Sequence, residues 1–181
     1  MLNTKRRTLI KVEVKLGDIS KFETDALITA INSGGMWFGG IDGVIQRSCG
    51  GNIFHSQAEA AMPLKHGDTV VANSLDLPRK NTFQNVIFVV DDLQGPLHQI
   101  IYNGLVAATK AGFTSVTLPM IRMGVMIGVV EKSSQEATRE MAKGVKKFMA
   151  EYPESNLLVA TFVVCDCYEP LKVQLEKDLS N

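Results

Sequence analysis

Segments that are apolar at almost every position recur along the chain and restrict its fold more than any other feature. They cover residues 26–31, 86–90 and 157–164, and each has the length of a β-strand. A strand without polar alternation is buried on both faces, as in parallel sheets that helices cover on both sides. Because helical periodicity separates these segments, the sequence predicts an α/β sandwich around a largely parallel sheet.

The other elements follow from local periodicity and from turn residues. Alternation of apolar and charged residues over 11–16 predicts a half-exposed strand, and two further strands are expected at 69–73 and 115–119. Ser133 and Glu136 have the spacing of a capping box at the start of a helix. Helices are expected over residues 41–48, 56–62, 96–111, 133–152 and 171–179.

Length and composition predict one globular domain. The 181 residues are 45% hydrophobic and 21% charged, which suits a single domain over 1–181. We expect a core over about 11–165 and a C-terminal helix over about 170–180. Lys plus Arg and Asp plus Glu both number 19, so net charge supplies no attraction to nucleic acid or to a membrane surface. The basic run at residues 5–7 is short and is interpreted as a solvated tail.

Two further features bear on the compartment. No apolar run reaches the length of a membrane span, and the beginning of the sequence lacks the apolar core of a signal peptide. Three cysteines, an odd number, suit a reducing environment better than a disulfide framework. We therefore expect a cytoplasmic protein that does not contact membranes.

A glycine-rich stretch follows the strand at 26–31. Residues 32–50 hold six of the fifteen glycines and the only tryptophan, and helical periodicity begins at Ile41. A glycine loop lets the backbone approach a ligand, and the unpaired N–H groups at a helix start attract phosphate. A plain surface connection, with Asp42 as a helix cap, is the alternative. A second loop at 120–130 follows another strand, so both loops are expected at the carboxyl edge of the sheet, where such folds bind ligands.

Four motifs in strand–loop–helix order resemble those of the macro domain, an ADP-ribose-binding α/β module. They are Gly-Asp-Ile at 17–19, the strand ending in Asn at 25–32, Gly-Gly-Ile-Asp-Gly-Val-Ile at 39–45, and the strand and loop at 115–126. The match spans nearly the whole chain. It implies a three-layer α/β/α sandwich with a central mixed, largely parallel six-stranded sheet.

The resemblance also implies roles for individual residues. Asp18 and Ile19 would bind the adenine, Asn32 would hold ribose hydroxyls, and Asp42 would position or activate a water. No metal and no cofactor is required, because the phosphate donors would be main-chain N–H groups. The implied ligand-binding residues are Asp18, Ile19, Gly39, Gly40, Ile41, Ser115, Pro119, Gly124, Val125, Met126 and Ile127.

Several positions differ from the macro-domain pattern and keep more than one function open. They are Thr29, Ile31, Trp37, Phe38, Gln46, Arg122 and Met126. The first hypothesis is hydrolysis of mono-ADP-ribosyl-protein or O-acetyl-ADP-ribose. The second is a non-catalytic module that binds ADP-ribose or an ADP-ribosylated protein, and the third is a scaffold or nucleic-acid module with an altered pocket. We expect Trp37 or Phe38 to lie over the ligand cleft.

Other candidate residues receive plainer interpretations. Cys165 and Cys167 alternate at a strand end and should point to opposite faces, so a zinc site is not expected. The three histidines, His55, His66 and His98, have no metal-ligand spacing and are interpreted as polar surface residues. Arg122 is either a phosphate contact or a solvated arginine at the rim of the cleft.

Overall fold

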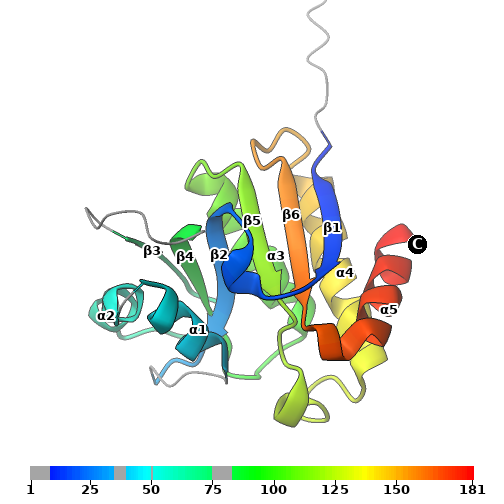
Figure 1. Ribbon diagram of the computed structural model, residues 1–181, viewed down its shortest axis with the longest axis horizontal. Coiled ribbons are helices and arrows are strands. Elements are labelled where there is room, and N and C mark those ends of the chain that lie inside the picture. Colours follow the sequence, from blue (N-terminus) through cyan, green and yellow to red (C-terminus); the bar gives the residue numbers. More distant parts are fainter. Residues whose placement is uncertain (1–8, 35–39, 50, 75–82) are drawn as a thin grey trace, which may run out of the picture.

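A six-stranded sheet forms the centre of the protein (Figure 1). The computed structural model describes residues 9–34, 40–49, 51–74 and 83–181. The strand order is β1-β6-β5-β2-β4-β3, and only the β3–β4 pair is antiparallel. The strands are β1 (Lys11–Leu16), β2 (Thr24–Ile31), β3 (Thr69–Asn73), β4 (Phe83–Val90), β5 (Ser115–Pro119) and β6 (Val159–Val164).

Helices cover both faces of the sheet and complete the expected three layers. One face packs against α3 (Leu97–Lys110) and α4 (Ser134–Glu151), with α5 (Glu169–Ser180) beside α4 and β1. The other face packs against α1 (Gly40–Cys49) and α2 (Ile53–Ala60). Within the residues that the structure describes, no helix has the length and apolar character needed to cross a membrane.

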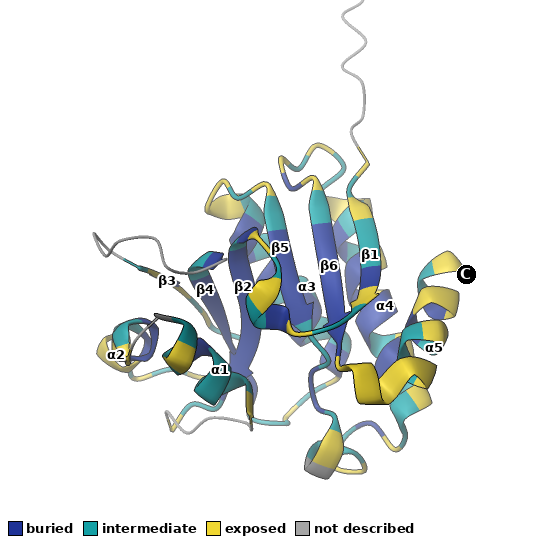
Figure 2. Cartoon of the chain, viewed as in Figure 1, coloured by how far each residue is buried: buried dark blue, intermediate teal, exposed yellow. Residues whose placement is uncertain are grey.

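Alternation along β2 explains why its sequence is apolar on both faces. Ile28 and Ala30 belong to the core under α3 and α4, whereas Leu27 and Ile31 belong to the core under α1 and α2. Successive side chains of a strand point to opposite faces, so a central strand supplies both cores. Figure 2 shows the same burial along β4, β5 and β6.

Most predicted boundaries are confirmed, and the differences have a tertiary cause. The strands β1, β3 and β5 have the predicted bounds, whereas α2 begins at Ile53, three residues earlier than expected. Phe54 in its first turn is fully buried and packs near Phe83, so tertiary packing extends the helix. The Ser133 cap is confirmed, because its Oγ accepts the Glu136 N–H at 3.1 Å.

Two glycines let α3 and α4 approach their neighbours closely. A Cβ atom at Gly144 of α4 would lie 2.6 Å from the carbonyl oxygen of His98 and 2.8 Å from Cβ of Ile101. At Gly104 of α3 it would lie 2.6 Å from Cγ2 of Ile28 in β2. Side-chain carbon atoms do not approach neighbours this closely, so both positions require glycine for this packing.

Candidate functional site

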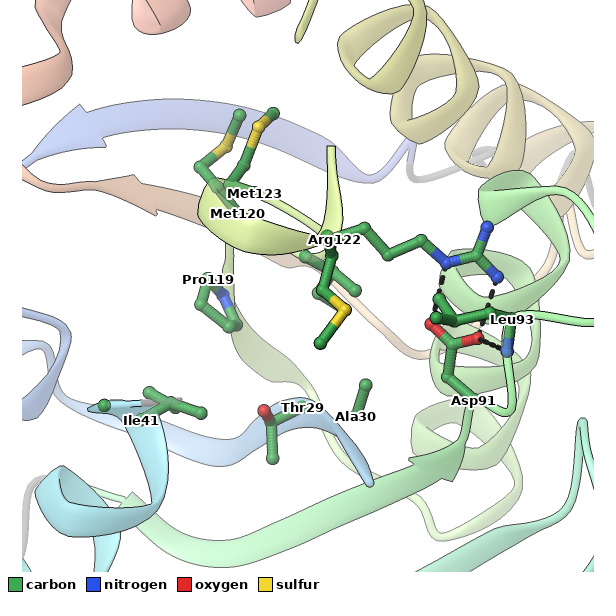
Figure 3. A pocket seen from close by; sticks show the side chains of 12 residues that line it. Thr29, Ala30, Ile41, Asp91, Leu93, Pro119, Met120, Arg122 and Met123 are labelled. Carbon is green, nitrogen blue, oxygen red and sulfur yellow. Dashed lines mark hydrogen bonds and ion pairs between the residues drawn. The ribbon is translucent and has the colours of Figure 1, made fainter. Parts of the chain in front are cut away.

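Two adjoining cavities lie at the carboxyl ends of β2, β5 and β6. The first, the Arg122 cavity, has a volume of about 270 Å³ and is lined by Thr29, Gly40 and Arg122 among others (Figure 3). The second, the Asp18 cavity, has a volume of about 670 Å³ and includes Asp18 in its wall. Pro119, Met120 and Met123 line both cavities, so the two form one cleft.

This cleft brings together many of the residues that the sequence predicted as ligand-binding. The Asp18 cavity is lined by Asp18, Ile19, Gly124 and Ile127, and the Arg122 cavity by Gly40, Ile41 and Met126, while Pro119 contributes to both. These residues come from three separate stretches, 17–19, 40–41 and 119–127. The start of α1, which follows the first glycine-rich stretch, and the loop after β5 therefore meet at the carboxyl edge of the sheet.

Other predicted residues lie elsewhere. Ser115 is at the amino end of β5, where its Oγ accepts the Asp25 N–H at 2.9 Å, so it lies at the opposite end of the strand from the cleft. The expectation of a ligand contact at Ser115 is therefore corrected. Trp37, Phe38 and Gly39 lie outside the described residues, as does the side chain of Val125.

Asp18 stabilises a local turn and also lines the cleft. Its Oδ1 accepts the backbone N–H of Ser20 at 3.0 Å and the Ser20 hydroxyl at 2.7 Å. These bonds cap a short 3-10 helix, η1 (Ile19–Lys21), and they hold the pKa of the Asp18 carboxyl below its usual value. The turn role and the ligand role considered for Asp18 are thus compatible, because a carboxylate has two oxygens.

Asp42 is held by a histidine that the sequence analysis placed on the surface. Nε2 of His55 lies 2.9 Å from Oδ1 of Asp42, and the His55 side chain is fully buried against the Phe88 ring. A carboxylate only accepts hydrogen bonds, so Nε2 of His55 carries the hydrogen and donates it. Asp42 follows Gly40 and Ile41 of the cavity wall directly, and its side chain is 14% exposed.

The interpretation of the histidines as polar surface residues is therefore wrong for His55. His55 is buried in α2, and the other two are partly buried with specific partners. Nδ1 of His66 accepts the Asp92 N–H at 3.0 Å, and Nδ1 of His98 lies 2.6 Å from Oε2 of Glu140. The sequence contains no local signal for this, because the partners lie on other elements.

Arg122 is also buried, which excludes a solvated arginine at the rim. Its guanidinium makes two 2.8 Å bonds to Asp91, which follows β4 (Figure 3). It also makes two 2.9 Å bonds to Glu131. Glu131 also accepts the N–H of Leu97 at 2.8 Å, so the cluster joins the loop after β5 to the start of α3. Burial alone would lower the pKa of Arg122, but the bonds to Asp91 and Glu131 raise it.

The ion cluster limits how the cleft can bind an anion. One guanidinium faces two carboxylates, so Arg122, Asp91 and Glu131 together carry about one negative charge at neutral pH. All three guanidinium nitrogens of Arg122 already bond to these two partners. Gly124 begins a 3-10 turn, η2 (Gly124–Met126), with φ +68°, a conformation that favours glycine. The N–H of Ile127 donates to the Gly124 carbonyl at 3.2 Å, so this N–H is engaged within the turn.

Cys165 and Cys167 also differ from their prediction. Their Sγ atoms lie 2.9 Å apart, so the thiols do not point to opposite faces. The prediction fails because β6 ends at Val164 and the chain then turns into a 3-10 helix, η3 (Asp166–Tyr168). Among the described residues there is no group of three or more His, Cys, Asp or Glu side chains that could hold a metal ion.

A family model and several related sequences match this chain. A family model described as Macro domain matches residues 28–137, which is more than half of the chain. The O-acetyl-ADP-ribose deacetylase of Klebsiella pneumoniae is 28% identical over 165 residues, covering 86% of this chain and 89% of that protein. An uncharacterized protein of Aeropyrum pernix is 27% identical over 150 residues, covering 81% of this chain and 77% of its own length.

Solved structures show the same fold. The Trypanosoma brucei macrodomain in complex with ADP-ribose superposes with a TM-score of 0.73 at 21% identity. The alignment covers 92% of this chain and 68% of that one. At this identity the likeness establishes the architecture, which agrees with the six-stranded mixed sheet described above.

Proposed function

Because the chain belongs to the macro domain family, we propose that it binds ADP-ribose, either free or attached to a protein, in the cleft at the carboxyl edge of the sheet. The observation that carries this proposal is the convergence of residues 17–19, 40–41 and 119–127 on one cleft. Two adjoining cavities suit an elongated ligand with a nucleoside at one end and a second ribose at the other. The Trypanosoma brucei relative, whose structure contains ADP-ribose, supports the ligand class.

The charges of the cleft favour one orientation of the ligand. The adenine would lie in the Asp18 cavity, where the carboxylate of Asp18 can accept its amino group. The diphosphate would lie over η2, where the backbone N–H groups of Gly124 and Met126 supply donors without a metal. The distal ribose would then point to the Arg122 cavity and to Gly40 at the start of α1.

We further propose hydrolysis of a mono-ADP-ribosyl-protein or of O-acetyl-ADP-ribose. Asp42 would take a proton from a water while the water oxygen attacks the carbon that carries the leaving group. The bond from this carbon to the protein carboxylate, or to the ester oxygen of O-acetyl-ADP-ribose, would break. The leaving group would then receive the proton that Asp42 had taken. General-base catalysis of this kind contributes about 10²–10⁴-fold to a rate. The deacetylase of Klebsiella pneumoniae supports this chemistry as a candidate.

His55 and Asn32 would assist without taking the proton. The N–H of His55 holds one oxygen of Asp42, which directs the other oxygen. Asn32 follows β2 directly and carries both a donor and an acceptor for a ribose hydroxyl pair. His55 would therefore orient the Asp42 carboxylate, and Asn32 would orient the ribose.

A non-catalytic ADP-ribose-binding module is the second candidate. Its support is the Arg122 cavity, where Arg122 and Met123 replace small residues of the family pattern and Met126 replaces an aromatic residue. A misplacement of the distal ribose by about 1 Å lowers a rate by about a hundredfold. Such a protein would bind the ligand tightly and turn it over slowly or not at all.

Two measurements separate these candidates. Calorimetric titration with ADP-ribose should give micromolar affinity, about −8 kcal/mol, without added metal. The absence of heat and of a thermal shift at millimolar ADP-ribose would refute the binding proposal. Release of labelled ADP-ribose from an auto-modified transferase, and of acetate from O-acetyl-ADP-ribose, then tests hydrolysis. Binding with no release above the buffer control, from either substrate, leaves the non-catalytic module.

A further inference from the structure

The thiols of Cys165 and Cys167 meet at the rim of the Asp18 cavity. Both residues are exposed, and their Sγ atoms lie 2.9 Å apart. The N–H of Tyr168 donates to the carbonyl of Cys165 at 2.9 Å, which closes the turn that places the two sulfurs together. A disulfide has an S–S length of about 2.05 Å, so little movement separates the dithiol from the bonded pair.

The two thiols are chemically unequal. The hydrogen bond from Cys167 lowers the pKa of the Cys165 thiol, and the same contact raises the pKa of Cys167. The thiolate is the nucleophile in cysteine chemistry, so Cys165 is the attacking residue and Cys167 the resolving one. Both are accessible to a small oxidant.

A metal is a poorer explanation of the pair than redox chemistry. Soft metal sites in proteins use three or four ligands, and the part of the chain that the structure describes contains no such group. Two adjacent exposed thiols with unequal nucleophilicity are instead the arrangement of a redox site.

The pair is joined directly to the ligand cleft. Cys165 and Tyr168 line the Asp18 cavity together with Asp18. The residue before Cys165, Val164, accepts the N–H of Gly17 at 2.9 Å, so the end of β6 holds the turn that begins at Gly17. A change in the turn at 165–168 can therefore move η1, because the hydrogen bond between Gly17 and Val164 and the shared wall of the Asp18 cavity connect the two segments.

We propose that Cys165 and Cys167 form a reversible redox pair that oxidises to a disulfide and alters the turn at residues 17–21. The thiolate of Cys165 attacks a hydroperoxide, the O–O bond breaks, and a sulfenic acid forms while the peroxide leaves as water or alcohol. The sulfur of Cys167 then attacks the Cys165 sulfur, and the displaced hydroxide takes the Cys167 proton and leaves as water. The balance is two thiols and one hydroperoxide to one disulfide, water, and a second water or an alcohol. A small thiol reductant returns both thiols by disulfide exchange.

The test uses the full chain with and without stoichiometric hydrogen peroxide. We expect an intact-mass loss of about 2 Da, and maleimide labelling of the unfolded protein should fall from three thiols to one. Peptide mapping should place the bond between residues 165 and 167. In the C49S variant, which removes the third cysteine, labelling should fall from two thiols to none, and C167S should stop at a sulfenic acid that dimedone traps. Three labelled thiols after peroxide, or a bond to Cys49, would overturn the redox pair.

Hydrogen exchange without ligand tests the link to the cleft. Exchange of a peptide that covers residues 17–22 should differ by at least about threefold between the reduced and oxidised protein, in wild type and in C49S. The same peptide should be unchanged by peroxide in a C165S/C167S double variant. A disulfide that forms without any change in this peptide would contradict the link. Neither readout requires ADP-ribose, so this result is independent of the proposed ligand.

Discussion

Nε2 of His55 in α2 lies 2.9 Å from Oδ1 of Asp42 in the first turn of α1. The histidine is fully buried against Phe88 of β4, so the sheet fixes the ring and the ring fixes the carboxylate. A charged group that a buried donor orients is better placed for catalysis than a carboxylate that caps a helix alone. The orientation of the proposed base thus depends on contact between two helices and the sheet.

Substitutions at Asp42 and His55 separate a catalytic role from a structural one. D42A should leave ADP-ribose affinity nearly unchanged and lower the release of labelled ADP-ribose by at least about a hundredfold. H55F keeps an aromatic ring against Phe88 but loses the N–H that bonds to Asp42. We therefore expect kcat to fall by about tenfold or more with little change in KM. H55Q, whose Nε2 can replace the histidine donor, should restore part of kcat.

Two controls accompany this prediction: the free energy of unfolding of D42A, and the binding and turnover of an N32A variant. A pure cap at Asp42 would make D42A cost about 1 kcal/mol in the free energy of unfolding while kcat stays constant per folded molecule. N32A should weaken both binding and turnover, because Asn32 would hold the ribose. Release that survives D42A would remove Asp42 from the mechanism, and full activity of H55F would limit His55 to packing.

Asp18 provides a test of adenine recognition. D18A should weaken ADP-ribose by about tenfold, roughly 1.4 kcal/mol, and ribose 5-phosphate much less, as measured by calorimetry. D18N keeps one oxygen for the Ser20 bonds and replaces the other with an amide donor, so it should lose ADP-ribose affinity with little change in Tm. Equal losses for both ligands would make Asp18 a turn residue only.

The same residue predicts a pH dependence. The bonds from Ser20 lower the pKa of Asp18 in the folded state. A group with a depressed folded pKa contributes to stability above its unfolded pKa, and this contribution is lost as the pH falls through the folded value. The free energy of unfolding of wild type should therefore fall more steeply than that of D18N as the pH drops through the acidic range, because D18N does not titrate there. Identical profiles for the two proteins would contradict the assignment.

The buried cluster around Arg122 predicts a large effect on stability. R122M leaves Asp91 and Glu131 buried without their cation, and we expect a loss of about 3–5 kcal/mol in the free energy of unfolding by urea. Adding D91N and E131Q to R122M removes the stranded charges and should recover part of this loss. A loss below about 1 kcal/mol in R122M would mean that water or counterions reach the site.

Two glycines in helices should respond to alanine with opposite signs. G144A places a Cβ atom 2.6 Å from the carbonyl oxygen of His98, and such overpacking costs about 1–3 kcal/mol. At Gly43 the nearest atom, 2.9 Å away, is the end of the flexible Arg47 side chain, so G43A should gain up to about 1 kcal/mol from helix propensity. Thermal unfolding of the two variants checks the sign. A stabilised G144A would contradict the close packing of α3 and α4.

Local sequence determined the elements because the period of apolar residues is a local property. The strands at 11–16, 69–73 and 115–119 have the predicted bounds, and Ser133 caps α4 as its spacing indicated. The sequence also predicted that two loops share the carboxyl edge of the sheet, because parallel strands place their ends together. The stretches 17–19, 40–41 and 119–127 accordingly line one cleft.

Only the tertiary structure decided the environment of the individual polar groups. From sequence, Arg122 was either a phosphate contact or a rim residue, His55 was a surface residue, and Cys167 was a thiol on the opposite face of a strand from Cys165. Arg122 meets Asp91 and Glu131, His55 meets Asp42, and Cys167 meets Cys165 through a turn that follows β6. Burial and charge pairing depend on which elements pack together, and residue spacing along one element does not contain that information.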